Sequence, residues 1–128
     1  MEFHSHTLPN GLEVIAECND DAHSIAVGFF VKTGSRDETD DVAGVSHFLE
    51  HMCFKGSKKR DAARLRHDVD AIGALWNAYT WWEGTAYFHW LPAAKMEASL
   101  EILCDMMAPV LPPDEFVKTF TLPDGYVI

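Results

Sequence analysis

The stretch "VAGVSHFLEHM", residues 42–52, places two histidines and a glutamate within five consecutive positions, as His47, Glu50 and His51. The apolar residues around them recur at the three- and four-residue spacing of an amphipathic helix: Val42, Val45, Phe48, Leu49 and Met52. Residues four apart on a helix lie one turn apart on the same face, so both imidazoles can point to one place. The stretch therefore predicts a helix that carries a two-histidine site.

This pattern of ligand types favours zinc. Imidazole ligands leave a coordination position open for water, and the metal lowers the pKa of that water towards roughly 7. Glu50 lies beside the histidine face, within reach of such a water, and is the candidate general base. The chemistry that follows is peptide hydrolysis, with His47 and His51 as zinc ligands. The alternative is two histidines that point to solvent on a surface helix.

Composition narrows the possible functions. A chain of 128 residues fits a single domain, and 48% hydrophobic with 23% charged residues is the balance of a globular protein. The formal net charge of −10 disfavours nucleic acid and anionic membranes as partners. Three scattered cysteines suggest neither a disulfide framework nor a thiolate metal site. With no visible leader or membrane span, the expected location is the cytoplasm, although a mature organellar protein has the same appearance.

The segments on either side of the motif alternate between strand and helix signals. "FHSHTLPNGLEVIAEC", residues 3–18, predicts a hairpin in which Gly11 supplies a positive φ, and residues 24–34 predict a largely buried, central strand. A second helix is expected after the N-cap Asp61, and residues 74–80 and 84–91 predict two strands. A third helix runs from Pro92 to Pro109, with a buried stripe of Met96, Leu100, Leu103 and Met107.

This order of elements indicates an α+β fold, a layered mixed or antiparallel sheet with helices packed on one side. The segments "LPNGLEV", "VGFFVKTGSRDETDDVAGVSHFLEHMCFKGSKKR" and "IGALWNAYT" occur in this order. Together they resemble the pitrilysin/insulinase family of inverted-motif zinc peptidases, which includes mitochondrial processing peptidase. The likeness covers nearly the whole chain, to about Phe116, and implies the N-terminal domain of such an enzyme.

The resemblance assigns roles by position. It implies that His47 and His51 bind zinc, that Glu50 is the base, and that the segment containing Asn77, Ala78 and Tyr79 is a sheet edge on which an extended peptide or unfolded polypeptide lies. Binding by strand addition uses backbone hydrogen bonds, so it can accept substrate peptides of varied sequence. The alternative for Ala78 and Tyr79 is an ordinary place in the core or on the sheet surface. Glu83 is expected either beside the metal ligands or at the exposed surface.

The likeness ends near the C-terminus. Family members supply a third zinc ligand, a glutamate, and a further acidic residue from a later helix. The corresponding stretch "DEFVKTFTLPDGYVI" has no glutamate after Lys118, which leaves Asp124 as a substitute ligand and residues 117–128 as a divergent tail. Family enzymes are also several times longer, so residues 1–128 are expected to form a single truncated domain whose cleft is completed by a second homologous domain or subunit. The rival function is a noncatalytic subunit or peptide-binding module.

Overall fold

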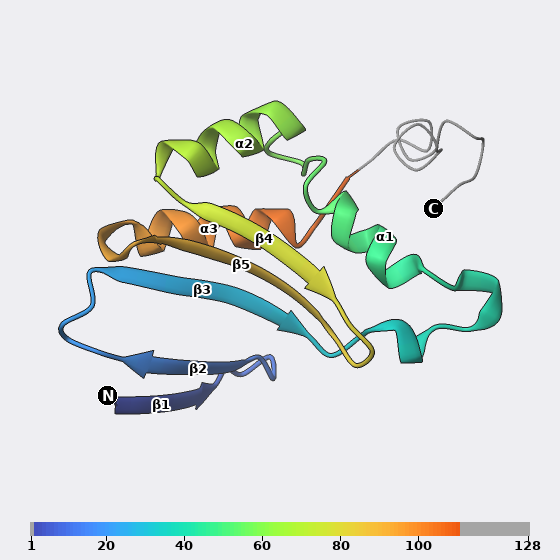
Figure 1. Ribbon diagram of the computed structural model, residues 1–128, viewed down its shortest axis with the longest axis horizontal. Helices are drawn as coiled ribbons and strands as arrows, with labels where there is room; N and C mark the ends of the chain where they lie inside the picture. Colours follow the sequence, from blue (N-terminus) through green and yellow to red (C-terminus); the bar gives the residue numbers. More distant parts are fainter. Residues whose placement is uncertain (1, 111–128) are drawn as a thin grey trace.

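The computed structural model describes residues 2–110, and their elements follow the predicted order (Figure 1). They are β1 (Glu2–Thr7), β2 (Glu13–Cys18), β3 (Ser24–Val31), α1 (Val45–Met52), α2 (Ala62–Ala71), β4 (Leu75–Thr80), β5 (Thr85–Pro92) and α3 (Met96–Met106). Short 3₁₀ turns precede α1 and α3. The predicted α+β class, with antiparallel sheets and helices on one side, is confirmed.

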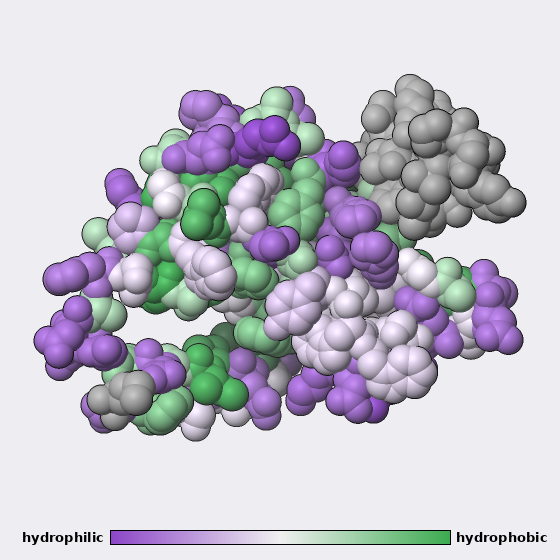
Figure 2. Space-filling model, viewed as in Figure 1, coloured by the Kyte–Doolittle hydropathy of each residue, from purple (hydrophilic) through white to green (hydrophobic). Residues whose placement is uncertain are grey.

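β1 and β2 form the expected hairpin. The turn closes with Gly11, whose φ of 87° is available to glycine at little cost, and the Gly11 amide donates to the carbonyl of Leu8 at 2.9 Å. All residues of both strands are exposed, including Phe3 and Ile15 at 70% and 76%. An open gap separates the hairpin from the rest of the molecule on the left of Figure 2. The hairpin therefore has no core of its own among residues 2–110.

The second sheet has the order β3-β5-β4, and both pairings are antiparallel. The expectation that residues 24–34 form a central, largely buried strand was wrong. β3 ends at Val31 and lies at the sheet edge, and its residues alternate between exposed and half-buried. β5 takes the central place because both of its neighbours pair with it, and most of its residues are buried. Alternation is the pattern of an antiparallel sheet that is covered on one face.

The helices pack against one face of this sheet. α1 contacts β4 and β5, α3 contacts β3 and β5, and α2 lies against β4 and α3. The buried core between them includes Leu65 and Val69 of α2, Leu103 and Met106 of α3, and Leu91 of β5. Burial of each such side chain contributes about 1.5–3 kcal/mol. α1 itself packs on β4 and β5 through a separate buried pair, Phe48 and Met52.

The buried face of α3 differs from the predicted stripe. Its buried residues are Ser99, Ile102, Leu103 and Met106, whereas Met96 and Leu100 are 39% and 38% exposed. The reason is a polar contact, because the hydroxyl of Ser99 lies 2.8 Å from Nδ1 of buried His89. A serine can occupy a core position when its hydroxyl has a buried hydrogen-bond partner. The spacing of apolar residues cannot predict such a position.

Arg60 joins α2 and α3. Its guanidinium donates to Asp68 at 2.8 Å, to Asp105 at 2.7 Å and to Glu101 at 3.1 Å, and its side chain is 11% exposed. The same contact holds the pKa of Asp68 well below its usual range. Within residues 2–110, no helix has the length and apolar character needed to cross a bilayer.

Candidate metal centre

The residue before the site helix α1 is its N-cap, Gly44, which takes the left-handed conformation at φ 92° and has no side chain to cap the helix. Glu38 caps it instead. Its Oε2 accepts the Gly44 N–H at 2.6 Å and its Oε1 accepts the Ser46 N–H at 2.8 Å. These backbone hydrogen bonds stabilise the charged carboxylate and so lower the pKa of Glu38.

The loop that carries Glu38 is attached to the turn between β4 and β5. The amides of Ser35 and Arg36 donate to the carbonyls of Trp81 and Trp82, at 3.2 and 3.0 Å. The Arg36 side chain also pairs with Glu83 at 2.5 Å. Glu83 is thus exposed, and it holds this loop through Arg36.

His47 and His51 lie side by side on α1, with ring centroids 4.5 Å apart. Ligand atoms of His47, Glu50 and His51 lie within 4.8 Å of one another, so the three could hold one metal ion. Glu50 is only 6% exposed, and its Oε1 lies 3.9 Å from Nδ1 of His51. Imidazole nitrogens are ligands that zinc takes in catalytic sites, and a carboxylate beside them can accept a proton from a water on the metal.

The surroundings of His51 favour the neutral ring that a metal ligand must have. Partial burial lowers its pKa, the charge of His47 lowers it further, and Glu50 opposes both effects. A lowered pKa keeps the ring neutral near pH 7, and only a neutral imidazole binds a metal.

A second contact fixes Glu50 from the sheet. The hydroxyl of Thr80, the last residue of β4, donates to Oε2 of Glu50 at 2.5 Å. Sequence reasoning missed Thr80, although a signal was present: Thr80 is two residues after Ala78 on a strand, and residues two apart share a face. Which residue of α1 faces Thr80 depends on how β4 packs against that helix. The sequence alone therefore could not predict that Glu50 is its partner.

His47 and Glu50 line a cleft with a volume of about 410 Å³. The cleft is lined by Ser35, His47, Glu50, Ala78, Tyr79 and Thr80. Of the three residues expected to contact substrate, Ala78 and Tyr79 therefore line the same cleft as His47 and Glu50. Ser35 was also missed, since nothing in its local sequence distinguishes it from other loop residues.

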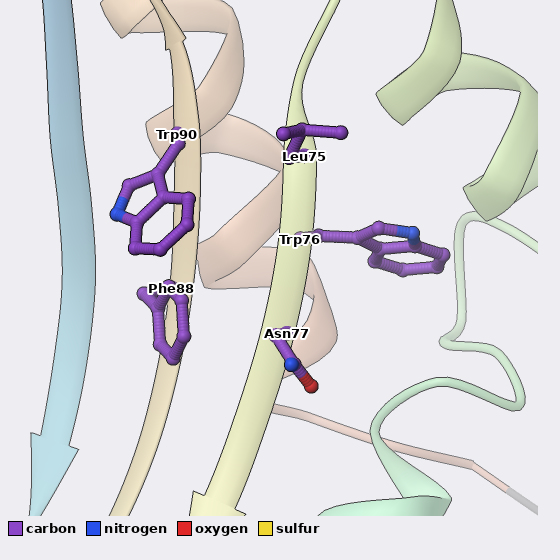
Figure 3. Close-up of a pocket in the computed structure, with 5 residues that line it drawn as sticks. All are labelled: Leu75, Trp76, Asn77, Phe88 and Trp90. Atoms are coloured by element: carbon purple, nitrogen blue, oxygen red, sulfur yellow. The ribbon is translucent and has the colours of Figure 1, made fainter.

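Asn77 lies elsewhere. It lines a separate shallow hollow with Leu75, Trp76, Phe88 and Trp90, with a volume of about 160 Å³ (Figure 3). Phe88 and Trp90 follow one another along β5 on the sheet face away from the helices, while Trp76 points away from them (Figure 3). Asp124 and the tail at 117–128 lie outside the described residues, so their predicted roles stay predictions.

With this geometry in place, comparison with known proteins identifies the class. The model of the insulinase family, peptidase family M16, matches residues 13–120. The chain belongs to this peptidase family, which confirms the resemblance that the sequence segments indicated.

Individual relatives are similar along most of this chain. A probable mitochondrial-processing peptidase subunit beta of Arabidopsis thaliana is 41% identical over 101 residues, covering 79% of this chain and 19% of that protein. An uncharacterized zinc protease of Bacillus subtilis is 39% identical over 101 residues, covering 79% and 25%. The crystal structure of a protease from Helicobacter pylori superposes with a TM-score of 0.84 at 34% identity, covering 91% of this chain and 29% of that one. The chain thus spans a quarter or less of these two curated relatives.

Proposed function

We propose that this chain is the metal-binding unit of a zinc metalloendopeptidase, in which His47 and His51 hold the ion and Glu50 is the general base. The observation that carries the proposal is the cluster of ligand atoms from these three residues, which lie within 4.8 Å of one another on one helix. The family membership and the zinc-protease names of relatives support the choice of metal. Two surface histidines without function would need neither the neighbouring buried carboxylate nor its partner on β4.

The two oxygens of Glu50 have different surroundings. Oε2 accepts the Thr80 hydroxyl, whereas Oε1 is directed to the side of His51, 3.9 Å from its Nδ1. When bound, zinc supplies a Lewis acid that acidifies a water molecule and polarises a peptide carbonyl. Oε1 of Glu50 is then the atom that takes the proton, while Thr80 keeps the carboxylate from rotating.

A peptide or unfolded polypeptide is the proposed substrate, bound in extended form along β4. Within residues 2–110, β4 pairs with β5 alone, so its other edge can accept a further strand. Ala78 and Tyr79 of β4 line the cleft beside His47 and Glu50. A substrate peptide that lies along this edge would bring a peptide bond to the group of His47, Glu50 and His51. Asn77 would then bind the peptide through its backbone rather than its side chain.

A noncatalytic subunit or peptide-binding module is the second candidate. It is favoured by the composition of the site, since the described residues group two histidines with the proposed base Glu50 and add no separate third ligand. Catalytic zinc sites usually have three protein ligands and a water. Under the first proposal, Asp124 or a second homologous domain or subunit completes the site.

Zinc binding separates these candidates. Affinity is measured by competition with a chromogenic chelator for the wild-type chain, His47→Ala, His51→Ala and Asp124→Ala, with His23→Ala as a matched control at an exposed position. We expect one zinc per chain, lost in both site variants and retained in the control. Glu50→Gln should keep zinc and lose cleavage of a mixed peptide panel. If zinc binding is weak and His51→Ala does not change it, the proposed metal site is wrong, and the noncatalytic module becomes the favoured function.

A further inference from the structure

The start of α1 depends on contacts from outside the helix. The first turn of any helix leaves backbone N–H groups without internal partners, and these are usually capped by a side chain at the N-cap. Here the N-cap is Gly44, which has no side chain to offer. With eight residues, α1 is also too short to be stable alone, because isolated helices below roughly 12–15 residues are marginal in water.

Glu38 meets this need with both of its carboxylate oxygens. One accepts the Gly44 N–H at 2.6 Å and the other the Ser46 N–H at 2.8 Å, so a single side chain occupies two of the free donors. Its negative charge also lies at the positive end of the helix dipole. Asp41 does not compete for these amides, since its side chain accepts a hydrogen bond from Thr39.

Glu38 is itself held in a fixed place relative to the sheet. Gly34, four residues earlier, packs so closely on the β4–β5 turn that an added Cβ would lie 2.2 Å from the carbonyl oxygen of Trp81. The backbone of Ser35 and Arg36 is hydrogen-bonded to the same turn. The carboxylate of Glu38 therefore connects the end of β4 with the residue that directly precedes His47.

We propose that Glu38 is a positioning residue for the metal centre, which sets the start of α1 and thereby places His47, Glu50 and His51 against β4. The role in metal binding rests on the proposed function, whereas the placement of the helix does not. Two contacts then define the helix relative to the strand: Glu38 at its N-terminus and the Thr80–Glu50 hydrogen bond in its second half.

The test compares Glu38→Ala and Glu38→Gln with Asp40→Asn, which removes a carboxylate from the same exposed loop without touching α1. Amide hydrogen exchange is measured on the chelator-treated chain, and zinc affinity on the same proteins. In Glu38→Ala, we expect the amides at the start of α1 to exchange roughly fivefold faster or more, as for loss of a cap. Zinc affinity should fall roughly tenfold, as for loss of a residue that orients ligands. Glu38→Gln keeps one carbonyl acceptor, so its exchange rates and zinc affinity should lie between those of wild type and Glu38→Ala.

The outcomes distinguish this proposal from the proposed function. Zinc binding in wild type that Glu38→Ala and Glu38→Gln leave unchanged would overturn the role at the metal centre. If wild type binds no zinc, the proposed function fails, and exchange at the start of α1 alone decides whether Glu38 places the helix. A merely structural role would accelerate exchange at Leu65 and Leu103 of the core as much as in α1, which would also overturn the proposal. If Glu38→Ala does not fold, the milder Glu38→Gln supplies the answer.

Discussion

Glu50 is a nearly buried carboxylate with one hydrogen-bond donor from a neighbouring element, the Thr80 hydroxyl. A buried charged group that loses such a donor keeps its desolvation cost without compensation. Thr80 thus combines two effects at the residue scale: it stabilises the fold at this point, and it orients the proposed base.

Thr80→Val tests this contact, because valine keeps the shape and removes the hydroxyl. We expect the free energy of unfolding in urea to fall by about 1–2 kcal/mol, while Thr80→Ser retains most of the stability. In a double-mutant cycle with Glu50→Ala, which removes the acceptor, the two changes should be coupled. Additive effects would show that the hydrogen bond does not contribute.

At the scale of elements, the loop at residues 34–38 and the β4–β5 turn form one packed unit. A Cβ at Gly34 would lie 2.2 Å from the Trp81 carbonyl oxygen, 2.4 Å from the Gly84 nitrogen and 2.7 Å from the Trp82 carbonyl oxygen. All three are backbone atoms, which cannot move aside as a flexible side chain can. Glycine is required here for close approach, since its φ of −141° is open to any residue.

Gly34→Ala should therefore separate the loop from the turn. We expect a loss of about 1–3 kcal/mol in unfolding free energy, the usual cost of overpacking. Faster amide exchange at Ser35 and Arg36 should accompany it, since their N–H groups donate to this turn. Lys32→Ala, at an exposed position on the same chain segment, is the control. Unchanged exchange at Ser35 would contradict the packing described.

At the scale of the whole molecule, His89 lies at the centre of the core, on the central strand β5. It is fully buried, Nδ1 contacts Ser99 of α3, and Nε2 has no hydrogen-bond partner within residues 2–110. Burial lowers the pKa of His89 from 6.5 to about 4, so the ring is neutral in the folded protein at pH 7.

The fold should consequently weaken in acid. Between pH 6.5 and 4, the unfolded chain binds a proton at His89 and the folded chain does not, so stability is present above pH 6.5 and is lost as pH falls. The full loss is about 3 kcal/mol for a shift of this size. Urea unfolding of the metal-free chain at pH 7 and pH 5 should show about 2 kcal/mol of this loss, since pH 5 lies 1.5 units below the unfolded pKa of 6.5. His89→Gln keeps an amide for Ser99 but does not titrate, and a slope equal to that of wild type would exclude His89 as the cause.

Much of this architecture could be predicted because the signals are local. The hairpin turn at Gly11, the N-cap at Asp61 and the helix that carries the histidines depend on neighbours a few residues away. The central place of β5 and the buried Ser99 could not be predicted, since one depends on strand pairing and the other on a partner ten residues away in another element.

By itself, the sequence determined that His47 and His51 share a helical face with Glu50 beside it, because the pitch of an α-helix places residues four apart together whatever surrounds them. Only the tertiary structure decided which groups surround them. Glu38 caps the start of α1, and the Thr80 hydroxyl donates to Glu50. Ala78, and not the Asn77 side chain, lines the cleft with His47 and Glu50. These contacts depend on how β4 is placed against α1, and that placement comes from packing across the whole core rather than from any local spacing.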